Sequence, residues 1–387
     1  MDTISSRFDE IRPLNNNEVK ATIEELLNTP KFEMAVKTAM PTIDWDSFCI
    51  KMRSLRTKRE FKTQMSALAL KSIAANTASL LDYSREERID RHAAYTFITN
   101  HRDIVLDAAF LNYVLHQAGA EMTQVAIGDN LLIEPWIEKL VRLNNSFIVK
   151  RGVSIRQMLE VSKTLSAYIH YAIKELNESV WIAQREGRAK DSNDFTQEAL
   201  LKMLVMGGEE ATILENLIEL NIEPMAISYE FDPCDFLKAK EYQQKRDNKE
   251  HKKSPADDLV NMQTGIVGFK GHIHFCFGHP INEQLKQLDP SMEKAELYRT
   301  VAAIIDKEIH QNYMFFPINY IAYQRTFGDD RFADKYNEAD IAAVDKYFEG
   351  QLAKIQLPNK DSEYLLSKMY EMYANPVKNY LIATNQH

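Results

Sequence analysis

Apolar residues recur at helical intervals through the first part of the chain. Val19, Ile23 and Leu26 follow this spacing, and the stretch 65–80 continues it with almost no glycine. Intervals of three and four residues place apolar side chains on one face of an α-helix. The pattern therefore predicts a helical N-terminal domain over residues 1–92.

The pattern changes after residue 92, where short apolar runs alternate with helical stretches. The runs predict strands at 94–99, 123–128, 146–150, 179–184, 224–230 and 272–277. Helical spacing lies between several of them, at 107–117, 155–176 and 197–207. Such alternation is typical of an α/β domain, which we expect over residues 93–285. Helical spacing returns over 286–387, which predicts a helical C-terminal extension.

Composition limits the kind of protein. The 387 residues are 45% hydrophobic and 27% charged, as in ordinary globular proteins. A formal net charge of -9 argues against nucleic acid as a partner. Cys49, Cys234 and Cys276 are far apart and odd in number, which disfavours a disulfide framework and favours a reducing compartment such as the cytoplasm.

Membrane contact is expected to be peripheral. The N-terminal residues do not form a secretory signal, and the chain has no apolar run of about 18 residues. The basic segment 51–62 is either a solvated helix face or a patch for anionic lipid headgroups. The aromatic segment 312–323 is a second candidate for a membrane-facing surface.

The junction between the strand at 94–99 and the following helix carries candidate catalytic groups. His101 in this turn can accept a proton from a bound hydroxyl, and Asp107 can fix its tautomer and stabilise the imidazolium. Asp103 is an alternative orienting acid. Because acidic residues are also favoured at helix N-termini, Asp103 and Asp107 can equally be plain capping residues.

Two later strand ends carry charge. Lys150 and Arg151 lie at the carboxyl end of the strand at 146–150, and Glu186, Gly187 and Arg188 follow the strand at 179–184. Ligands gather at the carboxyl ends of strands in α/β sheets, and arginine can hold a phosphate through two hydrogen bonds. Each cluster alone is also compatible with an ordinary basic strand end.

Together these clusters resemble the glycerolipid acyltransferase family, over about residues 93–280. The first motif is an Asn-His followed by an Asp, the second a strand ending in basic residues, the third a Glu-Gly turn with arginine, and the fourth a proline-led strand. The matching residues are Asn100, His101, Arg102 and Asp107; Phe147, Ile148, Lys150 and Arg151; Glu186, Gly187 and Arg188; and Pro224.

The chain departs from the family pattern at two places. Five residues separate His101 from Asp107, whereas the family's usual spacing is four, a position that Leu106 occupies here. The third motif lacks the proline often found before Glu-Gly, and Arg188 follows the glycine directly.

The resemblance implies a central mixed sheet flanked by helices and a direct acyl transfer without an acyl-enzyme. The donor is acyl-CoA or acyl-carrier protein, and the acceptor is a hydroxyl of glycerol 3-phosphate or 1-acylglycerol 3-phosphate, in phospholipid biosynthesis. His101 is the base and Asp107 its orienting acid. The acceptor-binding residues are Arg102, Lys150, Arg151, Glu186, Gly187 and Arg188. No metal or redox cofactor is implied, and the expected location is the inner face of the cytoplasmic membrane.

Other functions stay open. Another hydroxylated lipid, such as an aminoacyl lipid, is an alternative acceptor, and a non-catalytic lipid-binding relative is an alternative protein. The Gly-x-Ser-x-Gly motif of serine hydrolases and the glycine-rich loops of nucleotide enzymes are absent from the sequence. The run 271–280 favours a metal site as a minor alternative, because its strand carries His272, His274 and Cys276 on one face, with His279 beyond its end.

Overall fold

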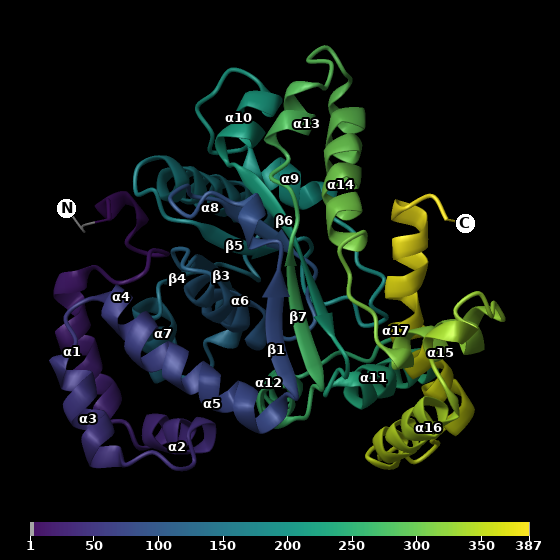
Figure 1. Ribbon diagram of the computed structural model, residues 1–387. Coiled ribbons are helices and arrows are strands. Elements are labelled where there is room, and N and C mark those ends of the chain that lie inside the picture. Colours follow the sequence, from purple (N-terminus) through teal and green to yellow (C-terminus); the bar gives the residue numbers. More distant parts are fainter. Residues whose placement is uncertain (1–3, 387) are drawn as a thin grey trace.

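The computed structural model describes residues 4–386 and is built around a seven-stranded sheet (Figure 1). The strands are β1 (Leu80–Ser84), β2 (Thr96–Thr99), β3 (Gln124–Gly128), β4 (Ser146–Val149), β5 (Val180–Ala183), β6 (Ile222–Tyr229) and β7 (His272–Phe277). Their order across the sheet is β1-β7-β6-β2-β5-β3-β4.

The sheet is mixed. Strands β2 to β6 pair in parallel, β7 is antiparallel to β6, and β1 is parallel to β7. Strands β1 and β7, at one edge of the sheet, are therefore antiparallel to the other five strands. This confirms the expected α/β fold with a central mixed sheet flanked by helices.

Three groups of helical segments surround the sheet. The first group comprises η1 (Ser6–Phe8), α1 (Asn16–Leu27), α2 (Pro30–Ala39), α3 (Trp45–Ser54), α4 (Lys58–Phe61), the π-helical η2 (Lys62–Ser66), α5 (Ala67–Thr77) and η3 (Glu86–Arg88). The second comprises α6 (Leu106–Gln117), η4 (Asp129–Leu131), α7 (Pro135–Leu143), α8 (Ile155–Lys174), α9 (Glu198–Leu204), α10 (Ile213–Glu219), α11 (Asp235–Asp247) and α12 (Pro255–Val267). The third comprises α13 (Asn282–Lys286), α14 (Lys294–His310), α15 (Pro317–Phe327), η5 (Ala333–Lys335), α16 (Glu338–Ala353) and α17 (Ser362–Ala383).

Separate apolar cores hold these layers together. One core packs α8, α9, α10 and α14 with the sheet, and a second packs α5 and α6 with β1, β2, β5, β6 and β7. The N-terminal helices have a core of their own with α7, and α15, α16 and α17 form another. Figure 1 shows α1–α3 and α15–α17 on opposite sides of the sheet.

The six expected strands all form, and β7 matches its predicted range of 272–277. Strand β1 was not expected, because the helical spacing through 65–80 predicted helix there. The structure places this strand, which belongs to residues 1–92, in the central sheet. The division of the chain into three domains stays a prediction.

The aromatic segment 312–323 is not a membrane-facing surface. Phe316, Ile318, Ile321 and Tyr323 are buried, and all four belong to the core around α17. Apolar side chains that fill a core are withdrawn from any lipid surface. Among residues 4–386, no helix is long and apolar enough to cross a bilayer.

Candidate active site

The loop after β2 begins with Asn100, which anchors it to the neighbouring strand. The Asn100 side-chain amide donates to the Ile227 carbonyl at 2.9 Å, and its oxygen accepts from the Ile227 backbone N–H at 2.8 Å. The buried side chain thus continues the pairing of β2 with β6 beyond the last ladder bond. This fixes the position of the next residue, His101.

His101 and Asp107 form a hydrogen-bonded dyad. The Nδ1 of His101 lies 2.8 Å from the Oδ2 of Asp107, which also accepts the backbone N–H groups of Arg102 at 2.6 Å and Asp103 at 3.0 Å. Asp107 lies in the first turn of α6, where the helix dipole favours a carboxylate. The loop therefore brings Asp107 into contact with His101 although five residues separate them, one more than in the family pattern.

Asp103 has a different position. Its Oδ1 accepts the backbone N–H groups of Val105 and Leu106, each at 2.8 Å, so that it caps the start of α6. Burial and the nearby Asp107 carboxylate raise the pKa of Asp103. Of the two acids considered from the sequence, Asp107 is the one in contact with the imidazole.

Two aromatic residues complete the surroundings of the dyad. Trp181 on β5 packs against the His101 ring, with centroids 5.7 Å apart, and its indole N–H donates to Thr99 Oγ1 at 3.0 Å. Burial, followed by the charge of Asp107, raises the pKa of Tyr229 well above its usual value. Sequence reasoning took both residues as ordinary strand positions, because β5 and β6 lie beside β2 only in the folded sheet.

His101 lies on the wall of a cavity of about 1610 Å³. One part of its lining is apolar and comes from the helical segments α2 to α9, η2 included, and from α12. The apolar residues include Phe32, Met34, Met40, Phe48, Phe61, Met65, Leu70, Ile73, Ile104, Leu140, Leu165, Leu200 and Ile266. Another part is basic and includes Lys150, Arg151, Arg185, Arg188, Lys190 and Lys253.

The cavity brings most of the predicted acceptor-binding residues together. Lys150 forms an ion pair with Glu10, and Arg151 Nη1 lies 2.7 Å from Glu186 Oε1. Gly187 adopts a φ of 66°, which favours glycine, and no atom lies within 4 Å of where a Cβ would be. All five residues of this group that come after β4 and β5 line the same cavity: Lys150, Arg151, Glu186, Gly187 and Arg188.

Arg188 is the cation with unused hydrogen-bonding capacity. Its Nη2 donates to Asn261 Oδ1 at 3.2 Å, whereas its buried Nη1 has no partner among the described residues. Arg185 also lines the cavity, although it is not part of the third motif. Its buried Nε likewise has no hydrogen-bond partner among the described residues. Because a buried unpaired donor is costly, these atoms suit a bound anion.

Arg102 does not join this group. Its side chain is buried in an ion pair with Asp194 and does not line the cavity, although the resemblance implied acceptor binding. Burial and the neighbouring Arg102 charge lower the pKa of His310 to about 4, which places this guanidinium beside α14. The physical reason is that successive residues after a strand point in opposite directions: His101 faces the cavity and Arg102 faces a buried carboxylate.

Residues 81–203 match the family model described as Acyltransferase. The chain carries an acyltransferase-family domain. The match covers the first three motifs and ends before Pro224, which leads the fourth. It confirms the resemblance drawn from the motifs and the expected class of enzyme, an O-acyltransferase.

Comparisons with individual proteins are more distant. No curated protein sequence matches the chain. Among solved structures, the chain is similar to the 1-acyl-sn-glycerophosphate (LPA) acyltransferase, PlsC, from Thermotoga maritima, with 10% identity and a TM-score of 0.36. That likeness covers 75% of this chain and 91% of the other. The family model carries the assignment of this acyltransferase-family domain.

Proposed function

We propose that the protein transfers a fatty acyl group from a thioester donor, acyl-CoA or acyl-carrier protein, to a hydroxyl of a glycerophosphate-type acceptor. The observation that carries this proposal is the position of the His101–Asp107 dyad on the wall of a cavity that is apolar on one side and basic on another. At about 1610 Å³ the cavity is larger than the usual ~300–1,000 Å³ small-molecule pocket, as a site for two substrates requires.

His101 acts as general base in the proposed reaction. With its Nδ1–H donated to Asp107, the imidazole presents the lone pair of Nε2 to the acceptor hydroxyl. Nε2 takes the hydroxyl proton as the oxygen attacks the thioester carbonyl, the new C–O bond forms and the C–S bond breaks. The imidazolium then returns the proton to the departing thiolate, and no acyl-enzyme is formed.

Asp107 supports this step through its own fixed position. Its side chain is fully buried and is held by two backbone N–H groups, so that the carboxylate does not have to reorganise when His101 becomes charged. A positioned general base contributes typically ~10²–10⁴-fold to rate. Alignment of the two substrates in one cavity contributes further.

The basic side of the cavity is proposed to hold the acceptor phosphate. Arg188 Nη1 and Arg185 Nε are buried donors without a hydrogen-bond partner among the described residues. A phosphate oxygen would accept their hydrogen bonds and balance the positive charge of the two guanidinium groups. Arg151 already has a carboxylate partner in Glu186, whose own exposed side chain can move to contact acceptor hydroxyls.

The apolar side is proposed to hold the acyl chain and to open toward a lipid surface. Met34, Ile133, Met158, Leu259 and Val267 line the cavity and yet are 37–64% exposed. A cluster of exposed large apolar side chains around one opening is typical of a surface that meets lipid or protein. We propose a peripheral contact between this rim and the cytoplasmic membrane surface.

Acyl transfer by the purified full chain tests the proposal. Labelled acyl-CoA and acyl-carrier protein are each offered against glycerol 3-phosphate, 1-acylglycerol 3-phosphate and an aminoacyl lipid, with His101→Ala alongside. We expect ester product with a phosphorylated acceptor and its loss in the variant. Transfer only to the aminoacyl lipid would replace the proposed acceptor. Donor binding without transfer to any acceptor would favour a lipid-binding protein.

A further inference from the structure

Strands β1 and β7 carry a row of polar side chains on one face. Asp82 lies opposite His274 in the parallel register, and Leu81 lies opposite Ile273 on the other face. That other face packs into the apolar core with α5 and α6. The polar face is therefore a regular consequence of strand alternation, and it places acid and histidine side chains of two strands next to one another.

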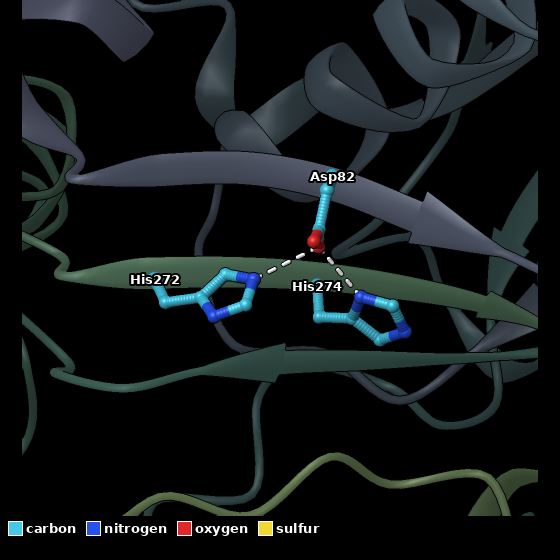
Figure 2. Close-up of side chains that lie close together, drawn as sticks. All are labelled: Asp82, His272 and His274. Atoms are coloured by element: carbon cyan, nitrogen blue, oxygen red, sulfur yellow. Dashed lines mark hydrogen bonds and ion pairs between the residues drawn. The ribbon is translucent and has the colours of Figure 1, made fainter.

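Three of these side chains converge on one point. The Oδ1 of Asp82 lies 2.9 Å from His272 Nε2 and 2.6 Å from His274 Nδ1. Figure 2 shows both imidazole rings turned toward the Asp82 carboxylate, one on each side of it. One nitrogen of each imidazole and one oxygen of the carboxylate all lie within 4.8 Å of one another.

We propose that Asp82, His272 and His274 bind a divalent transition-metal ion, for which zinc is the probe. Two imidazole nitrogens and one carboxylate oxygen, with water in a fourth position, form a common tetrahedral zinc set. Zinc lies ~2.0–2.2 Å from such donors, which puts the donors about 3.3 Å apart in a tetrahedron. The observed separations of 2.6 and 2.9 Å need to open by less than an ångström.

A second layer of contacts orients the donors. Ser84 Oγ lies 2.9 Å from His274 Nε2, so this ring can donate Nε2–H to Ser84 and present the Nδ1 lone pair to a metal. The backbone N–H of His272 donates to Glu230 Oε2 at 2.8 Å, and the His272 ring packs against Phe316 at 5.3 Å. A partner on the second ring nitrogen, as Ser84 is for His274, fixes the tautomer of a metal-binding histidine, and the contacts of His272 restrict where its ring lies.

Charge and access also fit a cation. A carboxylate with two neutral imidazoles has one net negative charge, and a divalent ion reverses it to one positive. The Asp82 side chain is 38% exposed and that of His272 is 22% exposed, which leaves a route from solvent, whereas His274 is 7% exposed. The site joins the edge strand β1 to β7 and is separate from the cavity that His101 lines.

The three residues of this site differ from the metal site that the sequence suggested, which comprised His272, His274, Cys276 and His279. Burial raises the pKa of the Cys276 thiol, and its Sγ contacts Asn312 at 3.6 Å. The ring of His279 lies 3.4 Å from Glu308, beyond the end of β7. Asp82 takes their place.

Metal binding by the full chain tests this inference. The protein is stripped with a chelator, dialysed, and titrated with Zn²⁺ alone, and bound metal is counted by elemental analysis after desalting. We expect one zinc per chain. Asp82→Asn, His272→Ala and His274→Ala should each abolish stoichiometric binding, and Ser84→Ala should weaken it by about 10- to 100-fold.

His279→Ala is the matched control, because it removes an imidazole next to the same strand and leaves the three donors in place. It should bind zinc as the unaltered chain does. Less than a tenth of an equivalent of zinc on the unaltered chain would overturn the proposal, and this result does not depend on how the variants fold. Stoichiometric zinc that persists in all three donor variants would overturn it as well.

Discussion

Two His–Asp pairs, one between the loop after β2 and helix α6 and one between β1 and β7, share a short contact and differ in their surroundings. His101 Nδ1 and Asp107 Oδ2 are 2.8 Å apart, and His274 Nδ1 and Asp82 Oδ1 are 2.6 Å apart. Asp107 is fully buried and held by backbone N–H groups, whereas Asp82 is partly exposed and carries a second imidazole. The first pair lines a large cavity, and the second contacts a further imidazole, that of His272.

The comparison teaches that a His–carboxylate contact does not define a function. The proposed base needs access to a substrate and a fixed acid: His101 lines the cavity, and Asp107 is buried and held by two backbone N–H groups. A metal site needs several donors directed at one point, which His272 and His274 supply around Asp82.

The largest expected effect separates the two carboxylates. Asp107→Asn should reduce kcat for acyl transfer by about 100-fold, because the amide no longer fixes or stabilises the His101 imidazolium. Asp82→Asn should leave kcat within about twofold, since Asp82 is outside the cavity. Steady-state kinetics of both variants, with folding checked by circular dichroism, measures this. Equal losses in the two variants would break the comparison.

Removal of the Arg188 guanidinium, whose Nη1 has no partner among the described residues, should act on binding rather than on chemistry. Arg188→Ala should raise KM for a phosphorylated acceptor by about 10- to 100-fold, as expected for loss of hydrogen bonds to a charged group. Arg151→Ala should have a smaller effect, because Arg151 is already paired with Glu186. An unchanged KM in Arg188→Ala would place the phosphate elsewhere.

Filling the apolar side of the cavity should shorten the preferred acyl chain. Ala69 on α5 lines the cavity, and Ala67 on the same helix does not. Ala69→Trp should lower kcat/KM for long-chain donors by about 10-fold relative to short ones, since each buried methylene contributes about 0.8 kcal/mol. A donor series from short to long chains measures it, with Ala67→Trp as the matched control.

The smallest expected effect concerns the rim. Met158 and Leu159, at the start of α8, are 53% and 64% exposed beside the opening. Changing both to serine should lower partitioning onto anionic vesicles by about threefold, because less apolar surface is buried at the membrane. Ile50→Ser, at a 71% exposed residue of α3 that does not line the cavity, is the control. Equal losses in both would remove the rim from the proposed membrane contact.

Local sequence predicted what depends on local pattern. Uninterrupted apolar runs marked the buried strands, and the turn after β2 marked His101 and Asp107, whose contact spans six positions. Strand β1 was missed because LLDYS is short and half-exposed at the sheet edge, so its pattern is weak. Local pattern also cannot give the direction of the Arg102 side chain, which is decided by Asp194.

Of the metal-type cluster, the sequence indicated His272 and His274 as candidate ligands but not Asp82, for a related reason. Asp82 reaches His274 only because β1 and β7 pair in one register, across 192 positions of the chain. Pairing of distant strands is set by the whole sheet and leaves no motif. Trp181 was missed as a neighbour of His101 for the same cause, since β5 and β2 are adjacent only in the folded sheet.

The central claim is that His101 promotes direct transfer from the thioester to the acceptor hydroxyl. A single-turnover experiment with labelled donor, run with and without acceptor on the unaltered chain and on His101→Ala, tests it most directly. The account predicts labelled ester only with acceptor, no label on the protein, and a rate lower by about 10²–10⁴-fold in the variant. Undiminished transfer by His101→Ala, or label that stays covalently on the protein, would contradict it.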